Sequence, residues 1–308
     1  MKIMIMGAGA VGGYFGARLA KAGEDVTFIA RGAHLDAMRQ NGLVVESTAG
    51  DFTIPVKATD DPAEVGEVDM ILFLVKLYDT DAGIEAIRPA VGDNTVVASF
   101  QNGITAREAL TDAFGARRTA GGTAYIAADV KEPGTIRHYS PFARLVFGPY
   151  EGTNRAPLEA FAAAMEGAGA SYEYVEDISR RVWEKFVFLS AFSAITSLTR
   201  LPIGPILADP NAKALFEDAL AEAFAVAKAH EPSVAPDTVE ERLKFIAKAN
   251  PNMRSSMLDD LTRGKRLEVP FLSGRLVALG EAAGIATPVH RAAFAALSPW
   301  RDGPPQIE

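Results

Sequence analysis

Apolar residues recur along the first 177 residues in a pattern that predicts a parallel sheet flanked by helices. Short apolar or β-branched runs predict strands, and the segments between them carry apolar residues at helical spacing. The predicted strands are Lys2–Met6, Val26–Ala30, Met70–Val75 and Thr95–Ser99. The predicted helices are Val11–Ala22, Ala33–Gln40, Asp81–Ile87 and Ala106–Phe114. This alternation is typical of an α/β domain.

The pattern then becomes richer in strands, which predicts an antiparallel extension of the same sheet. Pro133-Gly134 provides a turn between the first two of these strands. The additional strands are Thr123–Asp129, Thr135–Tyr139 and Arg144–Phe147, followed by a helix over Pro157–Ala168 and a last strand over Ser171–Val175.

From Ile178 to the end, apolar residues recur only at helical spacing, with breaks at proline and glycine. We expect about six helices in this half and no further strand. The sequence therefore predicts an α/β domain over 1–177 and an all-α domain over 178–308.

Composition and charge exclude several classes of function. The chain has 308 residues and a formal net charge of −8, which repels nucleic acid. It has no cysteine, which excludes disulfides and thiolate ligands, and its four histidines lie too far apart for a helical metal site. No apolar run is long enough to span a membrane. We therefore expect a cytoplasmic protein without a metal.

A glycine-rich segment directly follows the first predicted strand and opens the first predicted helix. It has the spacing GxGxxG, in which the glycines permit a tight turn, close approach to a pyrophosphate and close packing of helix on strand. The anion then meets free backbone N–H groups at a helix N-terminus. The expected cofactor contacts in this segment are Gly7, Gly9, Ala10, Val11 and Gly12.

The end of the second predicted strand bears on which dinucleotide is bound. An NAD site usually has a carboxylate there for the ribose 2′-hydroxyl, but this strand is followed by Arg31. A guanidinium suits a 2′-phosphate, so the sequence favours NADP. If Arg31 is only a surface residue on a helix-capping turn, the choice stays open.

Further motifs give a resemblance that covers nearly the whole chain. They are Gly7–Gly12, Ala30–Gly32, Val75-Lys76, Gln101–Gly103, Trp183–Lys185, Ser255–Asp260 and Arg266–Val269. In this order they resemble the ketopantoate reductase (2-dehydropantoate 2-reductase) family. The resemblance implies a Rossmann-type domain followed by a helical domain like the C-terminal domain of 6-phosphogluconate dehydrogenase. It also implies NADPH-dependent reduction of a 2-oxo acid to a D-2-hydroxy acid, as in pantothenate biosynthesis.

The resemblance assigns Lys76 and Asn102 to the cofactor side of the site, and Asn102 also to the substrate. Both follow predicted strands at their carboxyl ends, where open parallel sheets bind ligands. Lys76 can instead be a solvated loop lysine. Asn102 can instead be a turn residue, because Asn-Gly is a common turn dipeptide.

Lys185 matches the family's catalytic lysine, which donates a proton as hydride reaches the carbonyl carbon. An ordinary lysine is a poor acid at neutral pH, but burial among apolar neighbours lowers its pKa and makes it a better one. Without the resemblance, Lys185 would be interpreted as a lysine whose stem packs on an amphipathic helix.

Glu268 matches the family's substrate-binding and catalytic glutamate, and Ser256 matches its serine for the substrate carboxylate. A glutamate can accept a hydrogen bond from a substrate hydroxyl. Both residues can instead belong to helix termini, with Ser255 or Ser256 as an N-cap and Asp259 in a capping box.

The chain departs from the family pattern close to these residues. Leu189 and Ser193 stand where the family usually has asparagine, four and eight residues after Lys185 on one helical face. Ser273 also replaces an asparagine, and Pro270 an aspartate. We expect Leu189 and Ser193 to face the substrate, so a less polar 2-oxo acid fits better than ketopantoate.

Three alternatives remain open from the sequence. The chain can be a paralogous reductase of a less polar 2-oxo acid, a 3-hydroxy acid dehydrogenase, or an NADP-sensing binding protein without turnover. Apart from the small 2-oxo acid, the only partner that the sequence leaves open is a second copy of the chain in a homodimer.

Overall fold

The computed structural model describes residues 1–306. The chain divides into two compact units. The sheet unit comprises Met1–Gln101 and Thr105–Ile178. The helical unit comprises Asn102–Ile104 and the chain from Ser179 onward. The expected boundary after residue 177 lies one residue from this division, but no sequence pattern indicates that the short segment around Asn102 belongs with the helical unit.

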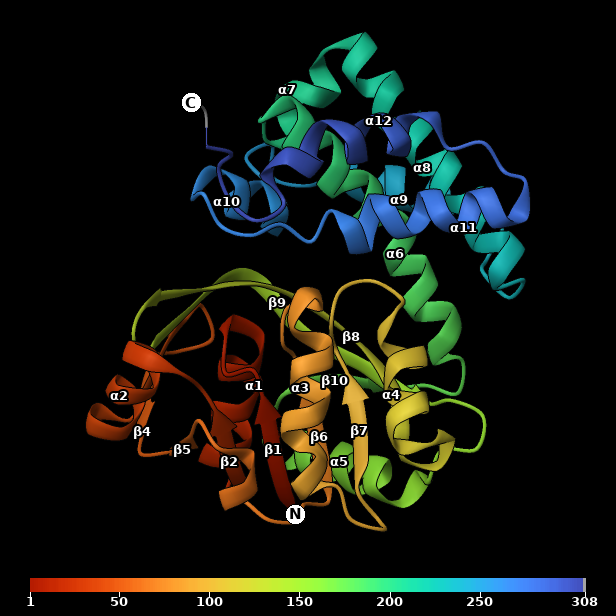
Figure 1. Ribbon diagram of the computed structural model, residues 1–308. Helices are drawn as coiled ribbons and strands as arrows, with labels where there is room; N and C mark the ends of the chain where they lie inside the picture. The colour runs from red at the N-terminus through yellow and green to blue at the C-terminus, as the bar shows by residue number, and fades with distance from the viewer. Residues whose placement is uncertain (307–308) are drawn as a thin grey trace. The chain divides into compact units, whose positions relative to one another are not determined.

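One ten-stranded sheet organises the sheet unit, in the order β4-β3-β9-β8-β7-β6-β1-β2-β5, with β10 paired to β9. Strands β1, β2, β5, β6, β7 and β8 are joined in parallel, and β8 and β9 are antiparallel (Figure 1). The strands are β1 Lys2–Met6, β2 Asp25–Ile29, β3 Leu43–Ser47, β4 Phe52–Ile54, β5 Lys57–Thr59, β6 Met70–Phe73, β7 Val96–Ser99, β8 Thr119–Glu132, β9 Thr135–Pro149 and β10 Ser171–Tyr174.

Helices cover both faces of this sheet because alternate strand residues point to opposite sides. In β6, Met70 and Leu72 join the core beneath α1 and α5, whereas Ile71 and Phe73 join the core beneath α3 and α4. All four side chains are fully buried. The α-helices are α1 Ala10–Lys21, α2 Gly32–Asn41, α3 Thr80–Ile87, α4 Ala106–Phe114 and α5 Arg155–Gly167. The predicted α/β alternation is thereby confirmed, with boundaries that differ by one or two residues.

The predicted strands on either side of residue 140 are a single long strand, β9, so the expected break there is wrong. Pairing with β8 passes from Ala143 opposite Ile126 to His138 opposite Ala128, which leaves the intervening residues of β9 in a bulge. Pro141 lies in this bulge, where a missing N–H donor costs no ladder bond. The turn at Pro133-Gly134 is confirmed, and Gly134 has φ +80°.

The helical unit consists of α-helices from α6 onward, and within residues 179–306 the structure has no strand. Its helices are α6 Ile178–Thr199, α7 Ile203–Ala208, α8 Pro210–His230, α9 Thr238–Ala247, α10 Ser256–Thr262, α11 Arg275–Ala283 and α12 Pro288–Leu297, with a π-helix, η5, at Pro270–Gly274 before α11. Helix α8 packs against α7, α9, α11 and α12, which places it at the centre of this unit. No helix among residues 1–306 is long and apolar enough to cross a membrane.

Candidate active site

The glycine-rich turn lies between β1 and the N-terminus of α1, as predicted. Gly7 has φ +105°, and a Cβ atom there would come within 2.9 Å of the Leu74 carbonyl carbon. A Cβ atom at Gly12 would lie 2.3 Å from the Gly7 carbonyl oxygen, so close packing of helix on strand requires glycine. Gly9 is exposed, and a Cβ atom there would meet nothing within 4 Å. The turn therefore offers open space beside the first N–H groups of α1, which fits a pyrophosphate.

His34 supports this turn, a role that sequence reasoning missed. Its Nε2 donates to the carbonyl of Ala8 at 2.9 Å, and its Nδ1 accepts from the N–H of Gly134 at 2.9 Å. Burial lowers the pKa of His34, so the neutral ring that can both donate and accept is favoured. The turn is thus tied to the β8–β9 hairpin, 100 residues from His34 along the chain.

Arg31 is the N-cap residue of α2 and lies two residues after the end of β2. Its side chain is exposed, and its guanidinium has no hydrogen bond or ion pair with any other residue of the described chain. An anion such as a 2′-phosphate can therefore bind Arg31 without displacing a protein partner.

Lys76 follows β6 and is partly buried at the start of the short 3₁₀ helix Leu77–Asp79. The loop that carries it is held by Gln101, another residue that sequence reasoning did not assign. The Gln101 side-chain amide donates to the carbonyl of Val75 at 3.0 Å and to Thr80 Oγ1 at 2.9 Å. Gln101 therefore fixes the backbone beside Lys76 to the end of β7.

In the helical unit, Lys185 and Asn102 are brought together. Lys185 Nζ donates to Asn102 Oδ1 at 3.1 Å. Burial lowers the pKa of Lys185 to about 8, and the negative charge of Glu268 acts in the opposite direction. Asn102 and Glu268, two other predicted site residues, therefore both act on the Lys185 ammonium group. With its lowered pKa, Lys185 is a much better acid near neutral pH than an exposed lysine.

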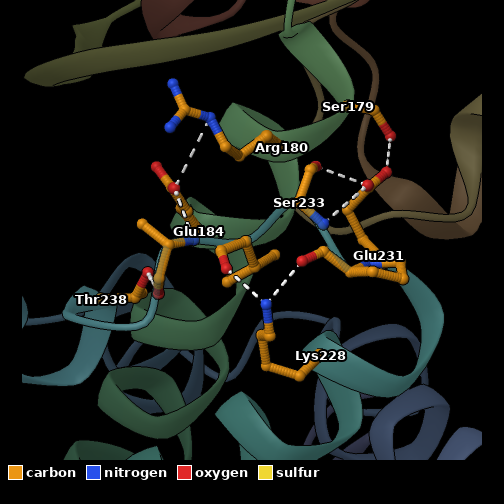
Figure 2. A network of polar contacts seen from close by, with 10 residues as sticks. Ser179, Arg180, Glu184, Lys228, Glu231, Ser233 and Thr238 are labelled. Atoms are coloured by element: carbon orange, nitrogen blue, oxygen red, sulfur yellow. Dashed lines mark hydrogen bonds and ion pairs between the residues drawn. The ribbon is translucent and has the colours of Figure 1, made fainter.

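The start of α6, which carries Lys185, is fixed by a polar network (Figure 2). Glu184 Oε1 accepts from the backbone N–H of Ala235 at 3.3 Å and lies 3.9 Å from Arg180 Nε. One turn earlier, Ser179 Oγ donates to Glu231 Oε2 at 2.5 Å. These contacts anchor the first turns of α6, up to the residue before Lys185, to the α8–α9 loop.

Glu268 is 5% exposed and lies two residues before the first residue of η5. Its side chain is thus buried in the same unit as Lys185. Ser256 is the exposed first residue of α10, whereas Ser255 is the N-cap and accepts from the N–H of Leu258 at 3.0 Å. The capping role therefore belongs to Ser255, which leaves the hydroxyl of Ser256 at the surface.

The positions that depart from the family pattern have different environments. Leu189 is partly buried one turn after Lys185. Ser193 is 1% exposed, and its hydroxyl has no partner among residues 1–306. Ser273, which replaces another asparagine of the family pattern, is 0% exposed and hydrogen-bonded to His290. That serine belongs to the core.

Comparisons with known proteins agree with this arrangement. The family model described as "Ketopantoate reductase PanE/ApbA" matches residues 3–152, and its C-terminal counterpart matches residues 177–300. A 2-dehydropantoate 2-reductase of Archaeoglobus fulgidus is 34% identical over 290 residues, covering 94% of each chain. An uncharacterized oxidoreductase of Bacillus subtilis, YkpB, is 30% identical over 297 residues, covering 96% of this chain and 98% of the relative.

A solved structure shows the same fold. The PanE/ApbA family ketopantoate reductase from Ralstonia eutropha JMP134 is 34% identical, with a TM-score of 0.89 over 98% of each chain. Its likeness extends over both the α/β unit with its Rossmann-like sheet and the helical unit. The chain belongs to the ketopantoate reductase family of oxidoreductases.

Proposed function

We propose that this protein reduces a small 2-oxo acid to a 2-hydroxy acid with NADPH. The observation that carries the proposal is the environment of Lys185, which is hydrogen-bonded to Asn102 and has a pKa lowered to about 8. A reductase of this kind needs a proton donor beside the reacting carbonyl, and a lysine with such a pKa is well matched to that task.

The sheet unit would hold NADPH through residues that fit it. The glycine-rich turn offers N–H groups and open space for the pyrophosphate. The guanidinium of Arg31, which has no partner among residues 1–306, suits the 2′-phosphate. Lys76 adds a cation at the carboxyl end of β6. Bound NADPH supplies the hydride for the reduction.

The helical unit would supply the proton and the substrate contacts. Lys185 donates its proton from Nζ to the carbonyl oxygen as the carbonyl carbon is reduced, so no free alkoxide forms. Asn102 holds the ammonium group by its side-chain oxygen. Glu268 is proposed to accept a hydrogen bond from the substrate, and Ser256 to donate one to its carboxylate.

The identity of the substrate side chain depends on Leu189. This residue is partly buried one helical turn from Lys185, where an amide would offer two donors and an acceptor. A leucine favours an apolar substituent on the 2-oxo acid. We therefore place a 2-oxo acid with an apolar side chain ahead of ketopantoate, and ketopantoate itself is the second candidate.

An assay of NADPH oxidation with ketopantoate, 2-oxoisovalerate, phenylglyoxylate and pyruvate tests both the proposed reaction and the proposed preference among substrates. Turnover of at least one of these acids, with NADPH preferred over NADH, is expected. Leu189→Asn should shift the ratio of kcat/KM values toward ketopantoate, by about 0.5 to 1.5 kcal/mol or two- to tenfold. No oxidation with any 2-oxo acid would reject the proposed function, and an unchanged ratio would reject only the role of Leu189.

A further inference from the structure

The backbone of Glu268 is continuous with a π-helix. Its carbonyl accepts from the N–H of Phe271 at 3.0 Å and from the N–H of Leu272 at 3.1 Å. The next carbonyl, that of Val269, accepts from the N–H of Gly274 at 3.0 Å. π-helical turns are rare and occur often at functional sites. The direction of the Glu268 side chain therefore depends on how η5 is held.

A buried hydrogen-bonded chain holds η5 from its C-terminal end. Ser273, the fourth residue of η5, has its Oγ 3.2 Å from His290 Nδ1, and His290 Nε2 lies 3.1 Å from the carbonyl oxygen of Ala219 in α8. Both Ser273 and His290 are 0% exposed.

The proton positions in this chain follow from its chemistry. A carbonyl only accepts, so Nε2 carries the proton and Nδ1 accepts from the hydroxyl of Ser273. Burial lowers the pKa of His290 to about 4, which keeps the ring neutral and able to accept.

His290 is itself fixed by its place in the helical unit. Glu222, one turn after Ala219 in α8, accepts from the backbone N–H groups of Val289 and His290 at 2.8 and 3.0 Å. The N-terminus of α12 is thus tied to α8 by two bonds. Gly274 allows η5 to approach α12 closely, because a Cβ atom there would lie 3.0 Å from the ring of Phe294. The anchor of η5 therefore rests on the central helix of the unit.

We propose that Ser273 and His290 are positioning residues, which hold the side chain of Glu268 in place for the substrate through the π-helix. This inference rests on the proposed function for its effect on turnover. The proposal gives a role to Ser273, which stands where the family usually has asparagine. Its hydroxyl donates to the Nδ1 of the neutral His290 ring. Neither residue contacts the substrate.

Amide hydrogen exchange tests the structural step without requiring any activity. In Ser273→Ala and in His290→Gln, amides of 268–275 should exchange at least tenfold faster than in the wild-type protein, with α9 unchanged. Ser197→Ala is the matched control, because Ser197 is 1% exposed and its hydroxyl has no partner among residues 1–306. Unchanged exchange in 268–275 in both variants would overturn the proposal.

Kinetics test whether the effect passes through Glu268. Ser273→Ala should raise KM for the 2-oxo acid about five- to twentyfold, with the affinity for NADPH unchanged. In a Glu268→Gln background the same change should alter kcat/KM by less than twofold, because the group being positioned is gone. An equal loss in both backgrounds would overturn the proposal. A wild-type protein without activity would reject the proposed function, and hydrogen exchange would then decide the positioning role alone.

Discussion

Lys185 Nζ donates a hydrogen bond to Asn102 Oδ1 at 3.1 Å, although the two residues are 83 positions apart in the sequence. The bond fixes the ammonium group at a defined point in the helical unit. Burial disfavours the charge on that group more than Glu268 favours it, and the pKa falls to about 8. The group therefore stays protonated at neutral pH and can give up its proton readily.

This pKa predicts the pH dependence of the reduction. Since the reaction needs protonated Lys185, kcat/KM should be constant below about pH 7 and fall about tenfold per unit above pH 9. Glu268→Gln removes the negative charge that raises this pKa, so the break should move to lower pH. A steady-state pH profile from 6 to 10 measures both.

Glu240→Gln serves as the control, because Glu240 is an exposed residue of α9 paired with Lys244. The control should leave the break in place. A wild-type profile without a break up to pH 10, or a shift to higher pH in Glu268→Gln, would contradict the assignment of Lys185 as the acid.

Arg31 should determine the preference for NADPH over NADH. A charged contact to the 2′-phosphate contributes about 1.5 to 3 kcal/mol, so Arg31→Ala should weaken NADPH tenfold to a hundredfold and NADH hardly at all. Fluorescence titration of both cofactors measures the two affinities. Arg39→Ala, an exposed arginine near the other end of α2, is the control and should change neither. Equal losses for both cofactors in Arg31→Ala would contradict the role of its guanidinium.

His290 should make the protein less stable in acid. Folding lowers the pKa of His290 from 6.5 to about 4, so between these values the unfolded chain binds a proton that the folded chain does not. Neutral His290 makes its full contribution to the free energy of unfolding above about pH 6.5. This contribution decreases by about 3 kcal/mol as the pH falls toward 4.

Denaturant unfolding at several pH values measures this dependence. In His290→Gln, which has no titrating ring, the free energy of unfolding should fall less between pH 6.5 and pH 4. The same decrease in both proteins would show that other groups cause it.

Much of the sheet unit was predictable because its signals are local. The strands β1, β2, β6 and β7, and the glycine-rich turn at Gly7, follow from runs of neighbouring residues. The strands β3, β4 and β5 were missed, because three to five residues with mixed polarity give too little periodicity to detect. The bulge around Pro141 was missed because its consequence depends on the partner strand.

The chemistry of the site was harder to predict, because it depends on contacts between distant residues. His34 supports the glycine-rich turn through Ala8 and Gly134, and no pattern near His34 indicates this. Ser273 stands out in the sequence only as a replacement of a family asparagine, and nothing near it indicates that its partner is His290 in the core. Alternation and helical spacing show which residues are buried, whereas they do not show which buried polar groups meet.

Single-turnover oxidation of bound NADPH in Lys185→Met tests the central claim most directly. The substitution keeps an unbranched side chain of similar length but removes the proton donor. With a saturating 2-oxo acid that the wild-type protein reduces, the rate should fall by about 10² to 10⁴, while the affinity for NADPH stays within twofold. Lys213→Met, which removes an exposed lysine of α8, should react at the wild-type rate. A wild-type rate in Lys185→Met would contradict the account, because Lys185 would then not be the proton donor.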